Sequence, residues 1–181
     1  IAATTRANLL SGPLRSRFGA VLKLDYYNIS DIEQIVARSA KTLKLNINPE
    51  AVKLIAQAAR FTPRVANRLL KRVRDYAEAH NNKTIGPEEA RKTFQLLEID
   101  YMGLEPADRR LIEIIIKKFN GGPVGINTLA AALNDDQGSI EDIYEPYLMS
   151  IGFLLRTSAG RIVTPAAYRH LGYQEPQEKL L

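Results

Sequence analysis

The first 23 residues combine hydroxyl and guanidinium side chains in an order that suits chemistry on a phosphoryl group. A strand-like run ends in the adjacent hydroxyls Thr4 and Thr5, and Arg15 and Arg17 follow around a turn. Threonine orients water or a phosphate oxygen, and arginine spreads a permanent charge over a planar fork. The stretch contains four basic residues and no acidic residue, so we expect an anion beside it. On spacing alone, an Arg-x-Arg pair after a turn is more often a solvated surface pair.

A second basic element begins at Thr62-Pro63, which is typical of a helix start with an N-cap and a first-turn proline. Arg64 follows in the first turn, where the positive helix end already favours anions. Arg64 is therefore a candidate anion ligand. We interpret the remaining cations of this helix as solvated surface charges: Arg68, Lys71, Arg72 and Arg74.

Four helical patterns follow one another between residues 30 and 97. Start signals mark each of them: Ser30 with Glu33, Asn48-Pro49, Thr62-Pro63 and Gly86-Pro87. Apolar residues at helical spacing give each pattern an inner face: Ile32, Ile35, Val36 and Leu43; Val52, Ile55 and Ala59; Val65, Leu69, Val73 and Tyr76; and Ala90, Phe94 and Leu97. Four short amphipathic helices predict a small bundle.

A second unit follows the segment from Asp100 to Pro106, which contains glycine and proline and is interpreted as a linker. Three more helices are predicted from these apolar positions: Leu111, Ile114, Ile115 and Phe119; residues 126–133; and Ile140, Ile143, Tyr147 and Leu148. Residues 153–157 and 161–164 then flank a glycine-containing turn, which predicts a β-hairpin. Three helices followed by a hairpin are typical of a winged helix, so the predicted fold is mainly α.

The predicted winged helix does not suit insertion into the major groove. Its third helix carries three acidic residues, which phosphates repel: Glu141, Asp142 and Glu145. The hairpin instead places Arg156 and Arg161 on either side of its turn, with Arg169 nearby in sequence. Arginines in such positions contact DNA phosphates without regard to base sequence. The alternative is that the hairpin arginines only keep the wing soluble.

Composition limits the class of protein. The 181 residues are 45% hydrophobic and include no cysteine and only two histidines, far apart in sequence. These numbers leave little material for a disulfide framework, a metal centre or a Ser/His/Asp site, and suit a reducing cytoplasm. No apolar run approaches the roughly 20 residues that cross a bilayer. The net charge of +5 is uneven, because residues 99–181 hold 8 basic and 11 acidic residues, so any DNA contact there must be a local patch.

The motifs ATTRA, PLRSRFG and TPRVANRLLKRVRDYA, in this order, resemble the AAA+ ATPases, and within them the RuvB family of Holliday-junction branch-migration motors. The resemblance runs along almost the whole chain. It implies that residues 1–23 end an ATPase core, that residues 24–101 form a helical lid, that residues 102–173 form a winged-helix DNA-binding domain, and that residues 174–181 are a polar tail. No G-x-x-x-x-G-K-[ST] loop occurs, so the phosphate loop and the magnesium ligands are expected upstream, and the chain is expected to be a C-terminal fragment.

The resemblance implies a role for several side chains at an ATP site. Thr5, with Thr4 as the less favoured neighbour, matches the family's sensor 1. Arg17 matches the arginine finger that reaches in trans into the neighbouring subunit's site, and Arg15 is read as a surface or interface residue. The choice between these two arginines rests on the resemblance alone. Arg64 matches sensor 2, which touches the γ-phosphate from the lid.

Two positions depart from the family pattern. Phe61 stands where the family usually has glycine, and Ala2 or Ala3 replaces a glycine of the first strand. Glycine permits close approach of backbone to a ligand, so both departures put the family's backbone contact with nucleotide in doubt.

The resemblance implies a hexameric ring in the bacterial cytoplasm that uses ATP and Mg²⁺ to drive branch migration. The ring would thread duplex DNA, act with RuvA at Holliday junctions and precede resolution by RuvC, in recombination, DNA repair and the SOS response. The RuvA contact is expected upstream, and the chain alone is expected to be inactive. One alternative is an origin-initiator or clamp-loader ATPase of the AAA+ class. Another is a non-enzymatic winged-helix DNA-binding regulator, which needs no nucleotide.

Overall fold

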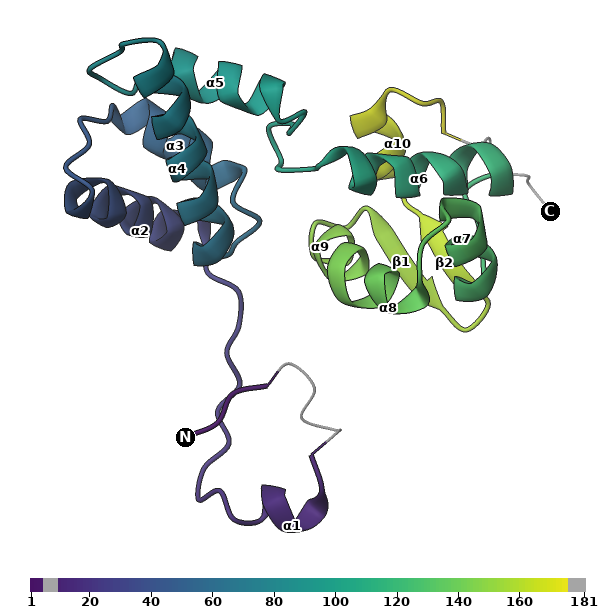
Figure 1. The fold of residues 1–181 in the computed structure, drawn as a ribbon. Helices are drawn as coiled ribbons and strands as arrows, with labels where there is room; N and C mark the ends of the chain where they lie inside the picture. Colours follow the sequence, from purple (N-terminus) through teal and green to yellow (C-terminus); the bar gives the residue numbers. More distant parts are fainter. Residues whose placement is uncertain (5–9, 176–181) are drawn as a thin grey trace.

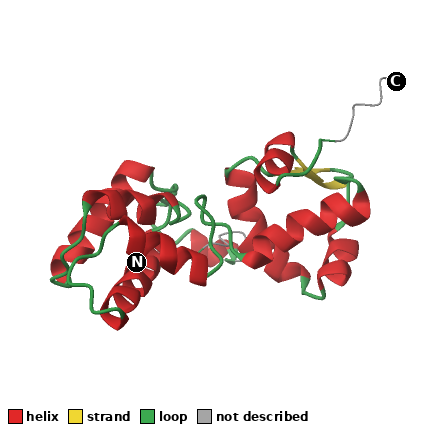
Figure 2. Ribbon diagram, turned by 90° about the horizontal axis from the view of Figure 1, so that it is seen from above, coloured by secondary structure: helices red, strands yellow, loops and turns green. Residues whose placement is uncertain are grey.

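The structure is a computed structural model that describes residues 1–4 and 10–175. This part of the chain is mainly helical and contains one two-stranded antiparallel hairpin, which confirms the predicted fold class (Figure 1). Two helical bodies, each with its own hydrophobic core, follow an N-terminal segment. The view from above separates the same two bodies and shows the hairpin in the second (Figure 2).

The first body is a four-helix bundle. Its helices are α2 (Ile29–Thr42), α3 (Pro49–Gln57), α4 (Pro63–Ala79) and α5 (Pro87–Leu96). As predicted, Asn48, Thr62 and Gly86 are the N-caps of the last three, each followed by proline. The predicted cap of α2 is wrong: Asn28 caps the helix, and its side-chain oxygen accepts from the Asp31 N–H at 2.8 Å. Asn28 keeps an extended backbone, as an N-cap requires, whereas Ser30 is already helical.

Apolar side chains from all four helices fill the core of the bundle. The largest fully buried members are Ile32, Ile55, Leu69 and Leu70. Two of the residues expected to face inward, Leu43 and Leu97, are exposed instead. Both are C-cap residues, so the chain leaves the helix there and their side chains turn away from the bundle.

The second body contains the winged-helix elements in the predicted order. They are α6 (Pro106–Phe119), α7 (Ile126–Leu133), α8 (Gln137–Ser139), the π-helical turn η2 (Ile140–Tyr144), α9 (Glu145–Ser150), β1 (Leu154–Thr157), β2 (Gly160–Val163) and α10 (Pro165–Leu171). The region predicted as one third helix is thus α8, η2 and α9 in succession. Pro146 lacks the N–H that a regular helix needs at this point, which accounts for the widened turn. The change of phase leaves Ile143, predicted to face inward, 58% exposed.

The hairpin pairs Leu154 with Val163 and Arg156 with Arg161 directly across its two strands. Its turn is shorter than predicted, because Gly160 already pairs within β2. Gly160 has a φ of +139°, and a Cβ there would lie 2.5 Å from the Val124 carbonyl oxygen. Arg161 and Val124 also exchange two backbone hydrogen bonds of 2.8 and 3.0 Å, which dock the wing against the loop after α6.

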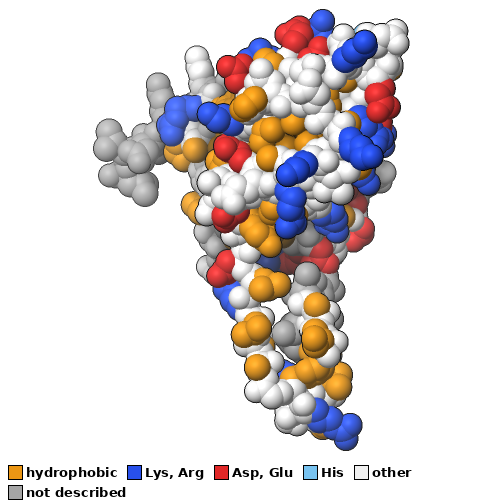
Figure 3. Space-filling view, turned by 90° about the vertical axis from the view of Figure 1, so that its left-hand side faces the viewer, with side chains coloured by type: hydrophobic (Ala, Val, Ile, Leu, Met, Phe, Trp, Pro, Cys, Tyr) orange, Lys and Arg blue, Asp and Glu red, His pale blue; other side chains and the backbone are white. Residues whose placement is uncertain are grey.

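The N-terminal segment carries the helical turn α1 (Gly12–Arg15) and lies apart from the two bodies (Figure 1). The expected strand is not formed in residues 1–4, which are exposed. A strand needs a neighbour, and the described part of the chain offers none here. Val21, Leu22 and Leu24 are strongly exposed, and Figure 3 shows apolar side chains over the narrow lower part of the molecule.

Candidate functional site

Arg15 and Arg17 lie at the end of α1 and in the turn after it. Arg15 occupies the last turn of the helix, and the Arg17 N–H donates to the Leu14 carbonyl at 3.2 Å. Both arginines are exposed, so either side chain is accessible to an anion or a second molecule. Thr5 lies outside the described residues, so its role as sensor 1 stays a prediction.

Arg64 is the second residue of α4 and is exposed at the positive end of that helix. The first turn contains no acidic residue. Thr62 makes no side-chain cap, because its hydroxyl donates back to the Ala59 carbonyl at 3.3 Å. Uncapped amides and a guanidinium together suit a phosphate. The helical turn α1, which directly precedes Arg17, lies well away from α4 (Figure 1), so the described residues do not bring the two arginines together.

The loop before α4 forms the junction between the two bodies. Arg60 and Phe61 both adopt the left-handed conformation, with φ values of 51° and 56°. Non-glycine residues rarely do so, and two in succession require strong contacts to hold them. The Arg60 Nε donates to the Gly103 carbonyl at 2.7 Å, and the Phe61 ring lies 6.2 Å from the Tyr147 ring of the second body. Phe61 therefore packs between the bodies at the position where the family pattern has glycine.

Arg60 also forms a largely buried ion pair with Asp108 in the first turn of α6. The two side chains are 13% and 1% exposed, and the Arg60 guanidinium lies 4.9 Å above the Tyr147 ring. The Asp108 Oδ2 accepts both from Arg60 and from the Glu105 N–H. Burial raises the pKa of Asp108, and the positive charge of Arg60 opposes that rise. The Arg60 charge thus compensates for the cost of burying the Asp108 carboxylate.

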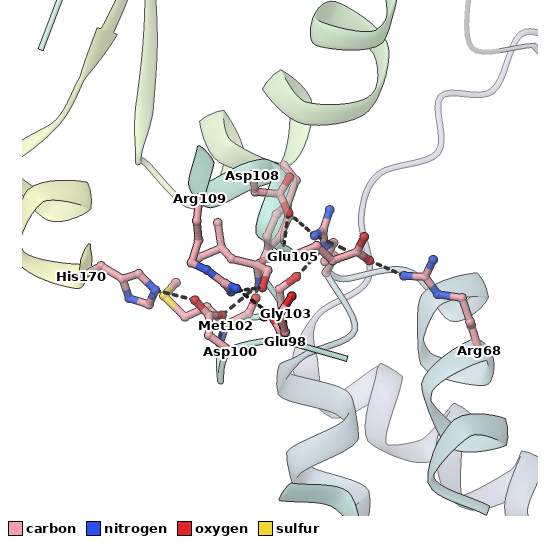
Figure 4. Close-up of polar contacts among 12 residues, drawn as sticks. Arg68, Glu98, Asp100, Met102, Gly103, Glu105, Asp108, Arg109 and His170 are labelled. Carbon is pink, nitrogen blue, oxygen red and sulfur yellow. Dashed lines mark hydrogen bonds and ion pairs between the residues drawn. The ribbon is translucent and has the colours of Figure 1, made fainter. Parts of the chain in front are cut away.

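A second ion pair joins the bodies beside the first. The Arg68 guanidinium, one of the cations interpreted as solvated, donates to Glu105 at 2.6 Å. Figure 4 shows Arg68 reaching from its helix toward Glu105, with Asp108 above Glu105 in this view. Glu105 also lies 3.9 Å from Arg60, so the two pairs form one network. Arg68 is exposed, as interpreted, but it is not an isolated charge, because α6 begins opposite it and Glu105 pairs with it.

The segment from Asp100 to Pro106 is tied down rather than free. Asp100 accepts from the Met102 and Leu104 N–H groups at 2.9 Å each, and its other oxygen lies 2.7 Å from His170 Nε2 (Figure 4). Arg109 donates to the Leu104 carbonyl within the segment at 2.8 Å and to the Glu98 carbonyl before it at 2.7 Å.

Gly103 sits at the closest approach of this segment to the first body. Its φ is +81°, and a Cβ there would lie 2.4 Å from the Ala58 carbonyl oxygen. Only glycine can adopt this positive φ without strain and also leave the space that a Cβ would need. The segment is therefore an ordered connection, whereas composition alone indicated a linker.

Sequence patterns did not identify Arg60 and Asp108, although one signal was present. Glu105 and Asp108 are the N-cap and third residue of a helix that starts at Pro106, the spacing of a capping box. That signal locates the helix start. It does not identify Arg60 as the partner, because the pair spans 48 positions in sequence.

The wing carries the second candidate site, made of four charged residues. Glu141 and Glu145 lie on η2 and α9, facing the arginines of the hairpin. The Arg161 Nε donates to Glu145 at 2.6 Å, and one Glu141 oxygen lies 3.1 Å from a guanidinium nitrogen of both Arg156 and Arg161. The two arginines are direct cross-strand neighbours, which repel unless anions lie between them.

The two hairpin arginines differ in accessibility, contrary to expectation. The Arg156 side chain is 53% exposed, whereas Arg161 and Glu145 are 7% and 3% exposed. The expected surface position of Arg161 is therefore wrong. Its hydrogen bond to Glu145 raises the pKa of the guanidinium, which stays charged. The acidic residues of the third helix also are not a free repulsive surface, because two of them pair with the wing.

Arg169 lies in the last turn of α10 and is exposed. Its guanidinium forms a 2.5 Å ion pair with Glu175, and both side chains are well exposed. Exposed ion pairs of this kind contribute little to stability, so another anion can replace Glu175. Arg169 is thus available to other anions.

Two other kinds of site find no support in the described part of the chain. No group of three or more His, Cys, Asp or Glu residues there could hold a metal ion. No helix there combines the length and apolar character that crossing a bilayer requires.

Two family models match the chain in succession. A model described as "RuvB AAA lid domain" matches residues 27–100, and one described as "RuvB C-terminal winged helix domain" matches residues 101–172. The boundary between them falls in the connection that Gly103 and Asp100 hold in place.

Curated relatives and solved structures agree with these matches. The Holliday junction branch migration complex subunit RuvB of Nostoc punctiforme is 49% identical over 99% of this chain and 49% of its own length. The corresponding subunit of Trichormus variabilis is 48% identical over the same shares. The Thermotoga maritima RuvB Holliday junction branch migration motor superposes with a TM-score of 0.88 at 45% identity, covering 93% of this chain and 57% of that one. The chain therefore spans about half the length of the curated relatives it matches.

Proposed function

Because this chain belongs to the RuvB family, we propose that it is part of an ATP-driven DNA motor that promotes branch migration of Holliday junctions. In this proposal residues 1–23 end the ATPase core, residues 24–101 are the lid, residues 102–173 bind DNA, and residues 174–181 are a tail. The whole protein is an ATP hydrolase that moves DNA as a homo-hexameric ring in the bacterial cytoplasm. It acts with RuvA and RuvC in recombination, DNA repair and the SOS response.

The proposal gives this chain three contacts with the nucleotide. Arg64 binds the γ-phosphate of ATP from the positive end of α4, Thr5 acts as sensor 1, and Arg17 acts as the arginine finger of the neighbouring subunit. The exposed positions of Arg17 and Arg64 support this assignment. ATP supplies the phosphoanhydride bond whose hydrolysis drives the motor. The family resemblance places the Mg²⁺ ligands outside this chain.

One observation supports a motor over a simple binding module: the lid helix α4 is tied to the winged helix at its first turns. Arg64 lies only four positions from Arg60 and from Arg68 on either side, and those two arginines pair with Asp108 and Glu105 of the second body. A movement of α4 in response to nucleotide would therefore carry the DNA-binding domain with it. A module that only binds DNA has no need of such a connection.

For DNA we propose backbone contacts through the wing and α10. Arg156 and Arg169 are exposed and contact phosphates directly. Arg161 is nearly buried, and it contributes through its NH2 group, which pairs with the half-exposed Glu141, while its Nε stays bound to Glu145. Contacts of this kind make binding independent of sequence and sensitive to salt.

Two other functions make different predictions. An origin-initiator or clamp-loader ATPase would hydrolyse ATP without preference for four-way junctions. A winged-helix regulator would bind DNA without any nucleotide response.

The experiment is ATP-dependent dissociation of a synthetic four-way junction by the full-length protein with RuvA. We expect Arg17→Ala to retain ATP binding and lose junction dissociation, with Arg15→Ala as the matched control. Mixing Arg17→Ala with a phosphate-loop mutant should restore some sites, because finger and loop act from different subunits. Full activity of Arg17→Ala, or equal loss in the Arg15 control, would remove the finger assignment. Absence of any ATP-dependent junction activity in the wild type would remove the motor.

A further inference from the structure

We propose that the Glu141 carboxylate occupies the site of a DNA phosphate on the wing, and that binding of duplex DNA replaces it between Arg156 and Arg161. This inference rests on the proposed DNA binding by the wing. It adds a residue that competes with DNA and so sets the affinity of the domain.

The geometry of the pairs is the first support. A single oxygen of Glu141 lies 3.1 Å from the NH2 group of Arg156 and 3.1 Å from the NH2 group of Arg161. The two arginines face each other directly across the hairpin, so both guanidinium groups can reach the same anion. A non-bridging phosphate oxygen accepts charge-assisted hydrogen bonds from guanidinium groups in the same way as a carboxylate oxygen. The site that Glu141 fills therefore suits a phosphate.

The two glutamates are not equivalent, which is the second support. Glu145 is 3% exposed and accepts from the Arg161 Nε at 2.6 Å, whereas Glu141 is 39% exposed. An anion from solution can reach the Glu141 position without unpacking the wing. Glu145 can remain as the buried anchor that holds Arg161 in place.

The charge of the group is the third support. Two arginines and two glutamates leave the patch neutral while Glu141 is in place. When Glu141 leaves, the remaining three charges sum to one positive charge, which matches one phosphate. The exchange thus keeps the two opposed arginines paired in both the free and the bound protein, so neither state exposes them to mutual repulsion.

The test is fluorescence anisotropy of the full-length protein on two unrelated duplexes across a salt series. Glu141→Gln keeps the shape of the side chain and removes its charge. We expect it to bind both duplexes about two- to fivefold more tightly than the wild type, the range that an ion pair of this exposure allows. Glu113→Gln is the matched control, since it removes an equally exposed carboxylate paired with Lys117 on α6. Its affinity should remain that of the wild type.

The two levels of the proposal fail in different ways. Equal affinity of Glu141→Gln and Glu113→Gln overturns the competition by Glu141, even if the wing binds DNA. In an Arg156→Ala background the gain from Glu141→Gln should largely disappear, and a full gain there also overturns it. If Arg156→Ala alone binds both duplexes like the wild type, the proposed DNA contact of the wing fails. Glu141→Ala should also raise the affinity for both duplexes. Thermal unfolding checks that each variant is folded.

Discussion

Replacing Arg60 by methionine tests whether the ion pair with Asp108 holds the two bodies together. Methionine has a similar length and can still pack on Tyr147, but it leaves Asp108, 1% exposed, without a positive partner. Two unit charges about 4 Å apart interact by about 4 kcal/mol at an effective dielectric constant of about 20. Breaking a buried pair by removal of one partner costs about 3–5 kcal/mol. Asp108 keeps its bond from the Glu105 N–H, so we expect about 3 kcal/mol.

The measurement is urea unfolding of the chain at pH 7, followed by circular dichroism, with hydrogen exchange of the α6 amides. The free energy of unfolding should fall, and the α6 amides should exchange faster than those of α2. The control is the double variant Arg60→Met with Asp108→Asn. It removes the buried charge as well as its partner, and the amide oxygen can still accept from Glu105, so it should recover most of the loss.

The pH dependence of the same variant has a definite sign. Burial already raises the pKa of Asp108, and loss of Arg60 removes a cause that lowers it. A carboxyl whose folded pKa is raised above the unfolded value of about 3.9 destabilises the fold above the folded pKa. That cost disappears as the pH falls through the folded pKa toward the unfolded value. The loss caused by Arg60→Met should therefore be largest near pH 7 and shrink toward pH 4. A loss below about 1 kcal/mol at pH 7, or one that is unchanged by pH, would refute the reasoning.

Four further outcomes are expected. The chain alone should give a flat calorimetric titration with ATP and magnesium, because this sequence contains no phosphate loop, and micromolar binding would contradict this. Arg64→Ala in the full-length protein should weaken the nucleotide response of its own subunit, so rescue by mixing with wild-type subunits would count against sensor 2. Gly152→Ala should cost only the about 1–2 kcal/mol of left-handed strain, because Gly152 has a φ of +72° but open space around it. Gly103→Ala should cost more than this control, because its Cβ would also meet the Ala58 carbonyl oxygen; equal losses in chemical denaturation would exclude the clash. Arg161→Ala should cost about 3–5 kcal/mol, since a buried glutamate loses its partner, whereas Arg156→Ala should cost less than about 1 kcal/mol; similar melting temperatures would contradict the difference in burial.

The sequence by itself determined the order and type of the elements. Local signals determine where three of the helices begin: Asn48-Pro49, Thr62-Pro63 and Gly86-Pro87. An N-cap residue followed by proline favours the first turn of a helix, whatever the rest of the chain does. Two short runs, residues 153–157 and 161–164, on either side of a glycine-containing turn likewise predicted the hairpin. The family resemblance also came from contiguous motifs, and the comparisons confirm it.

Predictions from the sequence were wrong where they depended on the exact residue at which a helix ends or on a local change in its number of residues per turn. Ile143 was predicted to face inward on a regular helix, but the π-helical turn before Pro146 rotates it to the surface. Leu97 fits the apolar spacing of α5, yet it lies where that helix ends. One residue more or less in a turn changes the face of every side chain after it.

Only the tertiary structure decided which charges find partners. Arg68 and Arg161 look alike in sequence to any surface arginine, but the first reaches Glu105 across the junction and the second is buried against Glu145. The Arg60 pair with Asp108 links residues 48 positions apart. The energy of an ion pair depends on distance and on burial, and both are set by how the bodies pack rather than by any spacing along the chain.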